Sequence, residues 1–209
     1  MRILIACEES QIVTKEFRKL GHEAYSCDLI ETSGEHPDWH IKGDVLTILN
    51  DGWDMMVGFP PCTYLSYAGT RHWDNPGRLR KRLDALEFFA KLWLAPINKI
   101  CLENPRGCAS PTIAKYTQLI NPYYFGDNYS KPTCLYLKKL PQLIHHNQDG
   151  LFDKATWVSK GEFVEYKRKD GTIKKESKWF RELSGNAKEL SKTFPGIAKV
   201  MAEQWGGNL

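Results

Sequence analysis

The sequence lacks the features that mark membrane-spanning and exported proteins. No stretch of its 209 residues approaches the ~20 consecutive apolar residues that a membrane-spanning helix needs. Glu8 and Glu9 follow the first apolar run, so the N-terminal segment has no apolar core of the length found in secretory signals. These absences predict a cytoplasmic protein that does not enter a membrane.

Cysteine is sparse and never forms a Cys-x-x-Cys pair. A disulfide-stabilised fold would be shorter and richer in cysteine. A zinc site built from His145 and His146 with Cys108 or Cys134 would have the wrong ligand spacing. We therefore expect free thiols and no metal. Four of the cysteines lie in apolar segments and are expected in the core: Cys7, Cys27, Cys101 and Cys134.

The composition is that of a folded globular chain. Hydrophobic residues make up 42% and charged residues 26% of the sequence, which argues against disorder. The formal net charge of +4 and the isoelectric point near 8.6 are compatible with a polyanionic partner without identifying one. The chain length fits one domain of ordinary size, or one domain with a small appendage.

Short apolar segments alternate with helical patterns over residues 1–140. Strands are expected over 2–7, 24–27, 53–59 and 99–102, with a further short element closing at 43–45. Helices are expected over 11–20 and 78–94. This alternation predicts an α/β fold with a mostly parallel sheet and helices on both faces. The buried face of the second helix is expected to carry Leu79, Leu83, Leu86, Phe89, Ala90 and Trp93.

The character of the chain changes after residue 140. Residues 163–175 alternate in polarity and contain Asp170–Gly171, which predicts a β-hairpin with a two-residue turn. Residues 160–181 hold eight Lys and Arg against four Asp and Glu, so this ribbon is either a solvated surface or an arm that contacts phosphates. We expect a catalytic α/β domain over 1–140, a basic hairpin insertion over 141–180 and a C-terminal part, 181–209. Its helix, about 195–205, returns to the core through Ile197, Val200, Met201 and Trp205.

Polar and reactive side chains follow each predicted strand. In open parallel sheets, ligands bind beyond the carboxyl ends of the strands. Carboxylates after the first three strands suit the hydroxyl and amino groups of a nucleoside, and a cysteine and a glutamate after the next two strands can meet at one small molecule. The residues are Glu8, Glu9 and Ser10, then Asp28, Asp44, Pro61–Cys62 and Glu103–Asn104.

Two of these segments carry a family resemblance. The run from Asp54 to Gly69, with Pro61–Cys62 at its centre and Ser66 four residues later, resembles the catalytic loop of DNA cytosine-5 methyltransferases. Leu102–Glu103–Asn104–Pro105 is similar to the Glu-Asn-Val motif of that family. Near the C-terminus, Arg181-x-Leu183-Ser184 followed by Phe194–Pro195 keeps the spacing of a late family motif. The small size resembles the stand-alone relatives that phages and prophages carry.

The resemblance implies a Rossmann-like, S-adenosylmethionine-dependent methyltransferase fold and an enzyme that methylates cytosine C5 in DNA. It implies a thiolate attack by Cys62 on C6 and a contact of Glu103 with N3 and the exocyclic amine of the base. It also implies base flipping where the DNA is duplex. The implied substrate contacts are Pro61, Ser66, Asn104 and Lys131, and the implied cofactor contacts are Glu8, Ser10, Asp28, Asp44 and Pro60.

The chain departs from the family in three places, and other interpretations stay open. Residues 7–10 replace the usual glycine-rich turn, Lys131 stands one position from an expected arginine, and 138–180 is short for a target-recognition domain. Cys62 could be a turn residue, and Glu103 could cap a helix. The protein could instead transfer a one-carbon unit from a folate to a free pyrimidine nucleotide, or bind DNA or a nucleotide without turnover. Trp73 is the tryptophan best placed to touch a nucleobase. The oligomeric state is not predicted.

Overall fold

The computed structural model describes residues 1–147, 154–155, 157–168 and 170–207. The strands are β1 (Arg2–Ala6), β2 (Glu23–Asp28), β3 (His40–Lys42), β4 (Met55–Gly58), β5 (Lys99–Asn104), β6 (Gln118–Ile120), β7 (Thr133–Lys138), β8 (His146–Asn147), β9 (Lys154–Ala155), β10 (Phe163–Lys167) and β11 (Ile173–Ser177). The helices are α1 (Ile12–Lys19), α2 (Arg78–Trp93), α3 (Ala109–Thr112), α4 (Lys178–Glu182), α5 (Ala187–Ser191) and α6 (Pro195–Met201), which continues as a π-helical turn over Ala202–Gly206.

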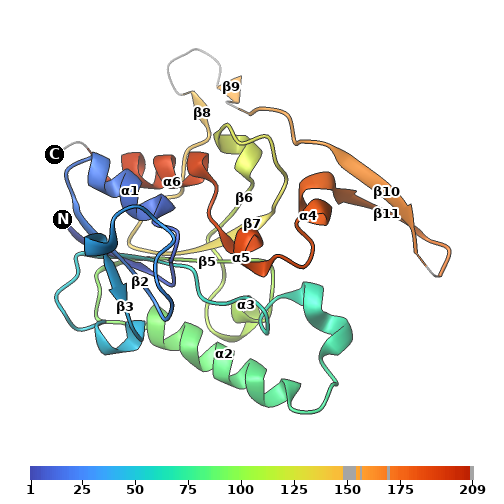
Figure 1. The fold of residues 1–209 in the computed structure, drawn as a ribbon, viewed down its shortest axis with the longest axis horizontal. Helices are drawn as coiled ribbons and strands as arrows, with labels where there is room; N and C mark the ends of the chain where they lie inside the picture. Colours follow the sequence, from blue (N-terminus) through green and yellow to red (C-terminus); the bar gives the residue numbers. More distant parts are fainter. Residues whose placement is uncertain (148–153, 156, 169, 208–209) are drawn as a thin grey trace.

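Seven strands form one sheet in the order β3-β2-β1-β4-β5-β7-β6 (Figure 1). The pairs from β3 to β5 are parallel, whereas β7 runs antiparallel to both β5 and β6. The carboxyl ends of β1 to β5 therefore share one edge with the start of β7. This is the topology of the Rossmann-like methyltransferase fold, so the predicted fold class is confirmed.

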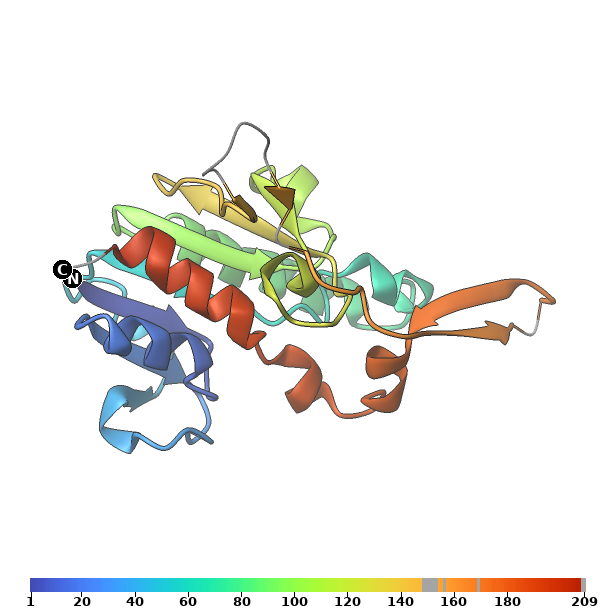
Figure 2. The ribbon, with the colours of Figure 1, turned by 90° about the horizontal axis from the view of Figure 1, so that it is seen from above.

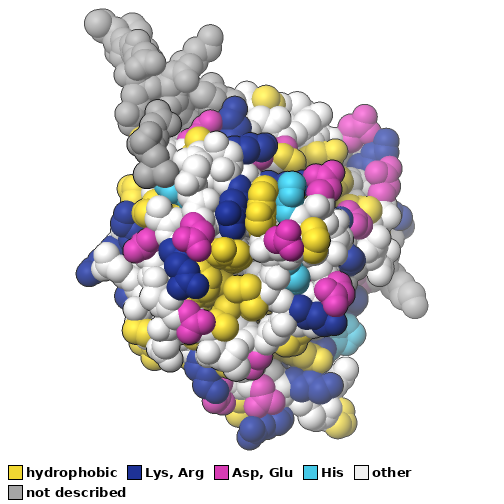
Figure 3. Space-filling view, turned by 60° about the vertical axis from the view of Figure 1, so that its left-hand side comes forward, with side chains coloured by type: hydrophobic (Ala, Val, Ile, Leu, Met, Phe, Trp, Pro, Cys, Tyr) yellow, Lys and Arg dark blue, Asp and Glu magenta, His cyan; other side chains and the backbone are white. Residues whose placement is uncertain are grey.

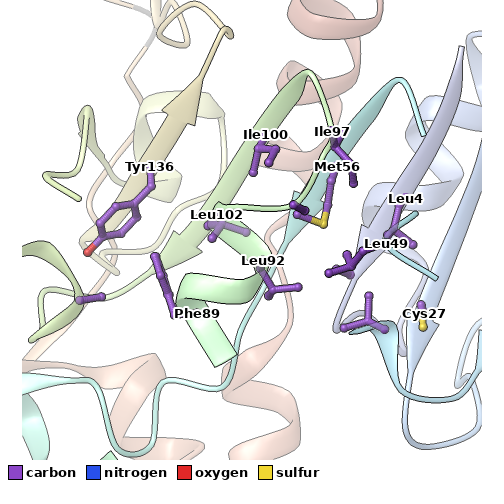
Figure 4. Packing of buried hydrophobic residues seen from close by; sticks show 14 of the residues in the cluster. Leu4, Cys27, Leu49, Met56, Phe89, Leu92, Ile97, Ile100, Leu102 and Tyr136 are labelled. Atoms are coloured by element: carbon purple, nitrogen blue, oxygen red, sulfur yellow. The ribbon is translucent and has the colours of Figure 1, made fainter. Parts of the chain in front are cut away.

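Both faces of the sheet are covered, because successive strand residues point to opposite sides. Leu4 and Ala6 belong to one core cluster and Ile3 and Ile5 to the other, and all four are fully buried. Helix α2 covers the first face, while α1 and α6 cover the second (Figures 1 and 2). Figure 4 shows the first cluster, in which side chains from the central strands meet those of α2. Its labelled members are Leu4, Cys27, Leu49, Met56, Phe89, Leu92, Ile97, Ile100, Leu102 and Tyr136.

The prediction that Leu79 and Leu83, in the first half of α2, belong to its buried face is wrong. Leu79 is 61% and Leu83 52% exposed, whereas Phe89 and Leu92 are fully buried. The helix thus reaches the sheet only with its C-terminal half, and its first turns lie beside the loop that follows β4. Helical periodicity identified the helix but not the length over which it meets the core.

Strands β10 and β11 form an antiparallel ribbon that projects away from the sheet (Figure 2). The expected two-residue turn is wrong: the amide of Arg168 donates to Thr172 (2.8 Å) and the amide of Gly171 to Arg168 (3.0 Å). Gly171 has a positive φ of 86°, so the hairpin closes through a longer connection that requires glycine at this position. The predicted C-terminal helix is present, and Ile197, Met201 and Trp205 are buried.

Charges of both signs are mixed on the face shown in Figure 3, where neither sign gathers into a patch. The positive net charge is therefore not concentrated on that side. Within the described ranges, no helix is long and apolar enough to cross a membrane.

Candidate active site at the carboxyl edge of the sheet

The loops that follow β4 and β5 are bonded to each other. Asn104 is buried, and its Nδ2 donates to the carbonyl oxygen of Pro60 at 2.8 Å. The amide of Cys108 donates to the carbonyl oxygen of Leu65 at 2.9 Å. In this arrangement, the side chain of Asn104 and the carbonyl of Pro60 hold the loop with Cys62 against the end of β5.

Gly107 allows the two loops to come this close. A Cβ atom at this position would collide with the carbonyl group of Leu65, and Gly107 forms an isolated β-bridge with Ser66. A larger residue would force the loops apart. No sequence pattern predicts the need for glycine at this position, because it depends on a contact between residues far apart in the chain.

Cys62 lies at the exposed start of a tight turn. Its carbonyl oxygen accepts hydrogen bonds from the amides of Leu65 (3.0 Å) and Ser66 (2.9 Å). The hydroxyl oxygen of Ser66 accepts from the amide of Ala68 at 3.1 Å and so begins the 3₁₀ turn over Tyr67–His72. Ser66 thus shapes the loop, while Pro61 is exposed beside the thiol.

Cys62, Glu103 and Lys131 form one electrostatic group. Partial burial raises the pKa of the Cys62 thiol, the Glu103 carboxyl raises it further, and Lys131 lowers it. Burial raises the pKa of Glu103, against the lowering effects of Lys131 and of a hydrogen bond from Thr133. The structure therefore brings both predicted catalytic residues and the predicted substrate contact Lys131 to the same place. Lys131 reaches it because β7 is antiparallel and begins at this edge.

The C-terminal segment closes over Glu103. Lys131 Nζ donates to the carbonyl oxygen of Leu190 at 2.9 Å and lies 5.8 Å from the ring centroid of Phe194. The cavity left beside Glu103 has a volume of about 10 Å³, which is room for roughly one water molecule. It is lined by Phe59, Glu103, Lys131, Thr133, Ser191, Lys192, Thr193, Phe194, Ile197 and Met201.

Glu8, a predicted cofactor contact, is turned into the protein. Its carboxylate accepts hydrogen bonds from the amides of Val13 (2.7 Å) and Thr14 (3.3 Å) and from the Thr14 hydroxyl (2.6 Å). It therefore satisfies the free N–H groups at the start of α1. Burial raises the pKa of Glu8 to about 7, although these hydrogen bonds act in the opposite direction. We correct its role to a helix cap.

Gln11 is a structural residue that the sequence did not reveal. It is fully buried with a φ of 59°, and its side chain exchanges two hydrogen bonds with the backbone of His36, at 2.7 and 3.1 Å. The carboxylate of Glu9 accepts a hydrogen bond from the amide of Ser33 (3.0 Å), in the same segment between β2 and β3 as His36. It also lies 3.6 Å from Lys188 of α5. Ser10 lies partly buried between them. These contacts fix the turn that stands in place of a glycine-rich one.

Asp28 ends β2, and its carbonyl oxygen accepts from the amide of Gly43, the residue before Asp44, at 2.8 Å. Burial raises the pKa of the Cys7 thiol most, and the charges of Asp28 and Asp44 raise it further. One oxygen of Asp28 accepts from the amide of Ile30 (3.2 Å), and one of Asp44 accepts from that of Leu46 (3.0 Å). Leu29 is 71% and Ile30 50% exposed, so apolar side chains lie next to these carboxylates. Carboxylates beside exposed apolar groups suit a nucleoside.

The remaining sequence expectations concern a metal site and the exposure of Trp73. Among the described residues, no group of three or more His, Cys, Asp and Glu could hold a metal ion. Trp73 is partly buried against the first core cluster, and the guanidinium of Arg82 lies 3.9 Å from its ring centroid. One face of this ring is therefore already covered.

The fold defines a Rossmann-like methyltransferase architecture, with a cysteine, a glutamate and a lysine at the edge where such folds bind ligands. No family model and no curated protein matches the chain. Among solved structures, it is similar to one assigned as a DNA modification methyltransferase encoded within a prophage of E. coli. The two share 12% identity with a TM-score of 0.42, over 75% of this chain and 51% of the other. The chain thus spans about half the length of that protein, and the similarity is too low to carry an assignment.

Proposed function

We propose that the protein is an S-adenosylmethionine-dependent methyltransferase that acts on C5 of cytosine in DNA. The observation that carries the proposal is the grouping of Cys62, Glu103 and Lys131 at the ends of adjacent strands. A thiol for nucleophilic addition and a carboxyl for the base edge are the two groups that cytosine activation requires.

Cys62 starts the reaction by adding to C6 of the base. The Sγ–C6 bond forms, and the electron pair of the C5=C6 double bond moves to C5 and toward N3. C5 would then bond to the methyl group that bound S-adenosylmethionine supplies, with the thioether as the leaving group. Loss of the C5 proton to a base then re-forms the C5=C6 double bond as the Sγ–C6 bond breaks. Lys131 supports the attack because its positive charge lowers the pKa of the Cys62 thiol.

A protonated Glu103 carboxyl would match the cytosine edge. This edge presents an acceptor at N3 and a donor at the exocyclic amine. A neutral carboxyl group offers the matching O–H donor and C=O acceptor, whereas a carboxylate only accepts. The burial that raises the pKa of Glu103 acts in favour of this neutral form.

The residues at the ends of β2 and β3 fit the implied cofactor. Asp28 and Asp44 provide acceptors for hydroxyl or amino groups, and Leu29 and Ile30 provide exposed apolar surface for a purine. When bound, S-adenosylmethionine supplies an electrophilic methyl group. We assign no cofactor contact to the side chain of Glu8, because its oxygens bind α1.

The proposal is tested with DNA, methyl-labelled S-adenosylmethionine and digestion to nucleosides. The expected product is labelled 5-methyldeoxycytidine, lost in Cys62→Ser and kept in the matched control Cys108→Ala. DNA containing 5-fluorocytosine should trap a covalent adduct with the native protein, because fluorine cannot leave as a proton does. Methylation by Cys62→Ser would overturn the mechanism. One-carbon transfer to free nucleotides from a folate, or cofactor-independent DNA binding alone, would overturn the proposed activity.

A further inference from the structure

The first residue of α2 reaches back to the loop that carries Cys62. Arg78 Nη2 donates to the carbonyl oxygen of Thr63, the residue after Cys62, at 3.1 Å. The guanidinium carbon lies 4.7 Å from the ring centroid of Tyr64. One side chain thus contacts both the backbone and an aromatic ring of this turn.

The position of Arg78 is unfavourable for the helix itself. A helix N-terminus carries a partial positive charge, which stabilises acidic side chains and destabilises cations. The first turn of α2 has no acidic residue, and Gly77 before it has a φ of 74° and caps it without a side-chain bond. An arginine here therefore does not serve helix stability, and its contacts with Thr63 and Tyr64 supply another reason for its presence.

The surroundings of Arg78 leave little freedom to the guanidinium. A Cβ atom at Gly69 would lie 3.2 Å from Arg78 Nη2, so the loop folds closely around this group. Helix α2 is in turn fixed to the sheet by Phe89 and Leu92, which are fully buried. Arg78 therefore connects the turn of Cys62 to a rigid element of the fold.

From this geometry we infer that Arg78 is a positioning residue that holds the Cys62 turn for attack on the base. The inference deepens the proposed function and rests on it. Arg78 acts through the Thr63 carbonyl and the Tyr64 ring and does not itself touch the reacting atoms. Its planar guanidinium can donate and stack at once, which a lysine cannot do.

The test compares Arg78→Gln with Arg80→Gln, a matched control. Arg80 lies two residues further along α2 and pairs with Asp84 at the exposed surface, at 2.9 Å. For Arg78→Gln we expect kcat to fall by about 10²-fold, because small displacements of a reacting group have effects of this size. The KM for S-adenosylmethionine should stay unchanged. Arg78→Lys should recover little of the loss, and Arg80→Gln should behave like the native protein.

A second readout does not depend on turnover. The alkylation rate of Cys62 by iodoacetamide, followed by peptide mass spectrometry, reports directly on the turn. It should change several-fold in Arg78→Gln and in Tyr64→Ala but not in Tyr64→Phe or Arg80→Gln. The effect of the double variant should be smaller than the sum of the effects of Arg78→Gln and Tyr64→Ala, because both substitutions remove the same Arg78–Tyr64 contact.

Equal alkylation and equal kcat in Arg78→Gln and Arg80→Gln would overturn the inference. If the protein failed to methylate cytosine at all, the proposed function would fall first. The alkylation series would then still decide whether Arg78 holds the turn.

Discussion

Two charges of opposite sign act on the Cys62 thiol. Glu103 raises its pKa and Lys131 lowers it. We therefore expect Lys131→Gln to move the pKa of Cys62 upward and Glu103→Gln to move it downward. The alkylation rate of Cys62 as a function of pH measures both, since only the thiolate reacts. Shifts of the same sign in the two variants would show that the three groups do not act together.

Glu8 should make folding stability depend on pH. Its pKa rises from 4.5 to about 7 in the folded protein, so the native state binds the proton more tightly than the unfolded state. The contribution of Glu8 to folding stability is therefore fully present below its unfolded pKa, and it is lost as the pH rises from 4.5 to about 7. This shift corresponds to up to about 3 kcal/mol in the free energy of unfolding.

The Glu8→Gln variant should flatten this dependence. Denaturant unfolding at a series of pH values measures the free energy of unfolding, and the slope between pH 4.5 and 7 should decrease relative to the native protein. A matched control is Glu16→Gln, also on this part of the chain, in α1, whose carboxylate pairs with Lys19 at 2.6 Å. An undiminished slope in Glu8→Gln would place the pH dependence elsewhere.

At the scale of elements, the ribbon β10–β11 is either a solvated surface or an arm that contacts the phosphates of DNA, and an experiment can distinguish the two. Helix α4 follows β11 directly, and at the base of the ribbon the amide of Lys178 donates to the carbonyl oxygen of Glu162 at 2.9 Å. Nearer the tip, the Arg181 guanidinium lies 4.6 Å from the Tyr166 ring centroid. Lys167 and Arg168 are exposed near its tip, while Lys169 lies outside the described residues. The structure thus offers cations to solvent on an arm that is attached at one end.

If the arm contacts DNA, neutralising Lys167, Arg168 and Lys169 together should weaken DNA binding uniformly across sequences. The slope of log K against log salt should decrease by about 2–3, because each phosphate contact contributes roughly 0.9. The control neutralises Lys15, Lys19 and Lys199. These pair with Glu35, with Glu16 of α1 and with Glu203 of the π-helical turn after α6, respectively. Equal slopes in the two triple variants would make the ribbon a solvated surface.

The elements that the sequence predicted are those with a local signal. β1, β4 and β5 are apolar runs buried on both faces, so composition alone identified them. β6 has only three residues and exists because it pairs with β7, so no local pattern predicted it. The sequence did not reveal that the start of α2 is exposed, because the apolar periodicity of this helix extends beyond the part that packs on the sheet.

The candidate site divides in the same way. Cys62 and Glu103 could be expected together because ends of parallel strands meet at one edge, which is a rule of topology. The functions of Asn104, Gln11 and Arg78 in holding loops depend on backbone carbonyls and amides of distant residues. The spacing of residues in the sequence does not identify those hydrogen-bond partners. Glu8 was expected to contact the cofactor for the same reason, because its hydrogen bonds to α1 depend on how the turn closes.

At the scale of the whole molecule, α5 links the two halves of the site. Lys188 lies 3.6 Å from Glu9 beside the predicted cofactor edge, and the Leu190 carbonyl binds Lys131 beside Glu103. The segment from Ser191 to Phe194 also closes the cavity at Glu103, whose volume is about 10 Å³. A pyrimidine ring is much larger than the one water that fits there. Entry of a base therefore requires this segment to move.

We expect amide hydrogen exchange in residues 186–194 to increase when DNA containing 5-fluorocytosine is trapped on Cys62. The reason is that the base displaces the segment from Glu103, and opened backbone exchanges faster. Amides of α1 serve as the internal control, because Val13 and Phe17 are fully buried on the sheet and should keep their protection. An adduct that forms with exchange in 186–194 unchanged would mean that the base approaches Cys62 without entering beside Glu103. In that case the proposed contact of Glu103 with the base edge would be wrong, while the covalent role of Cys62 would stand.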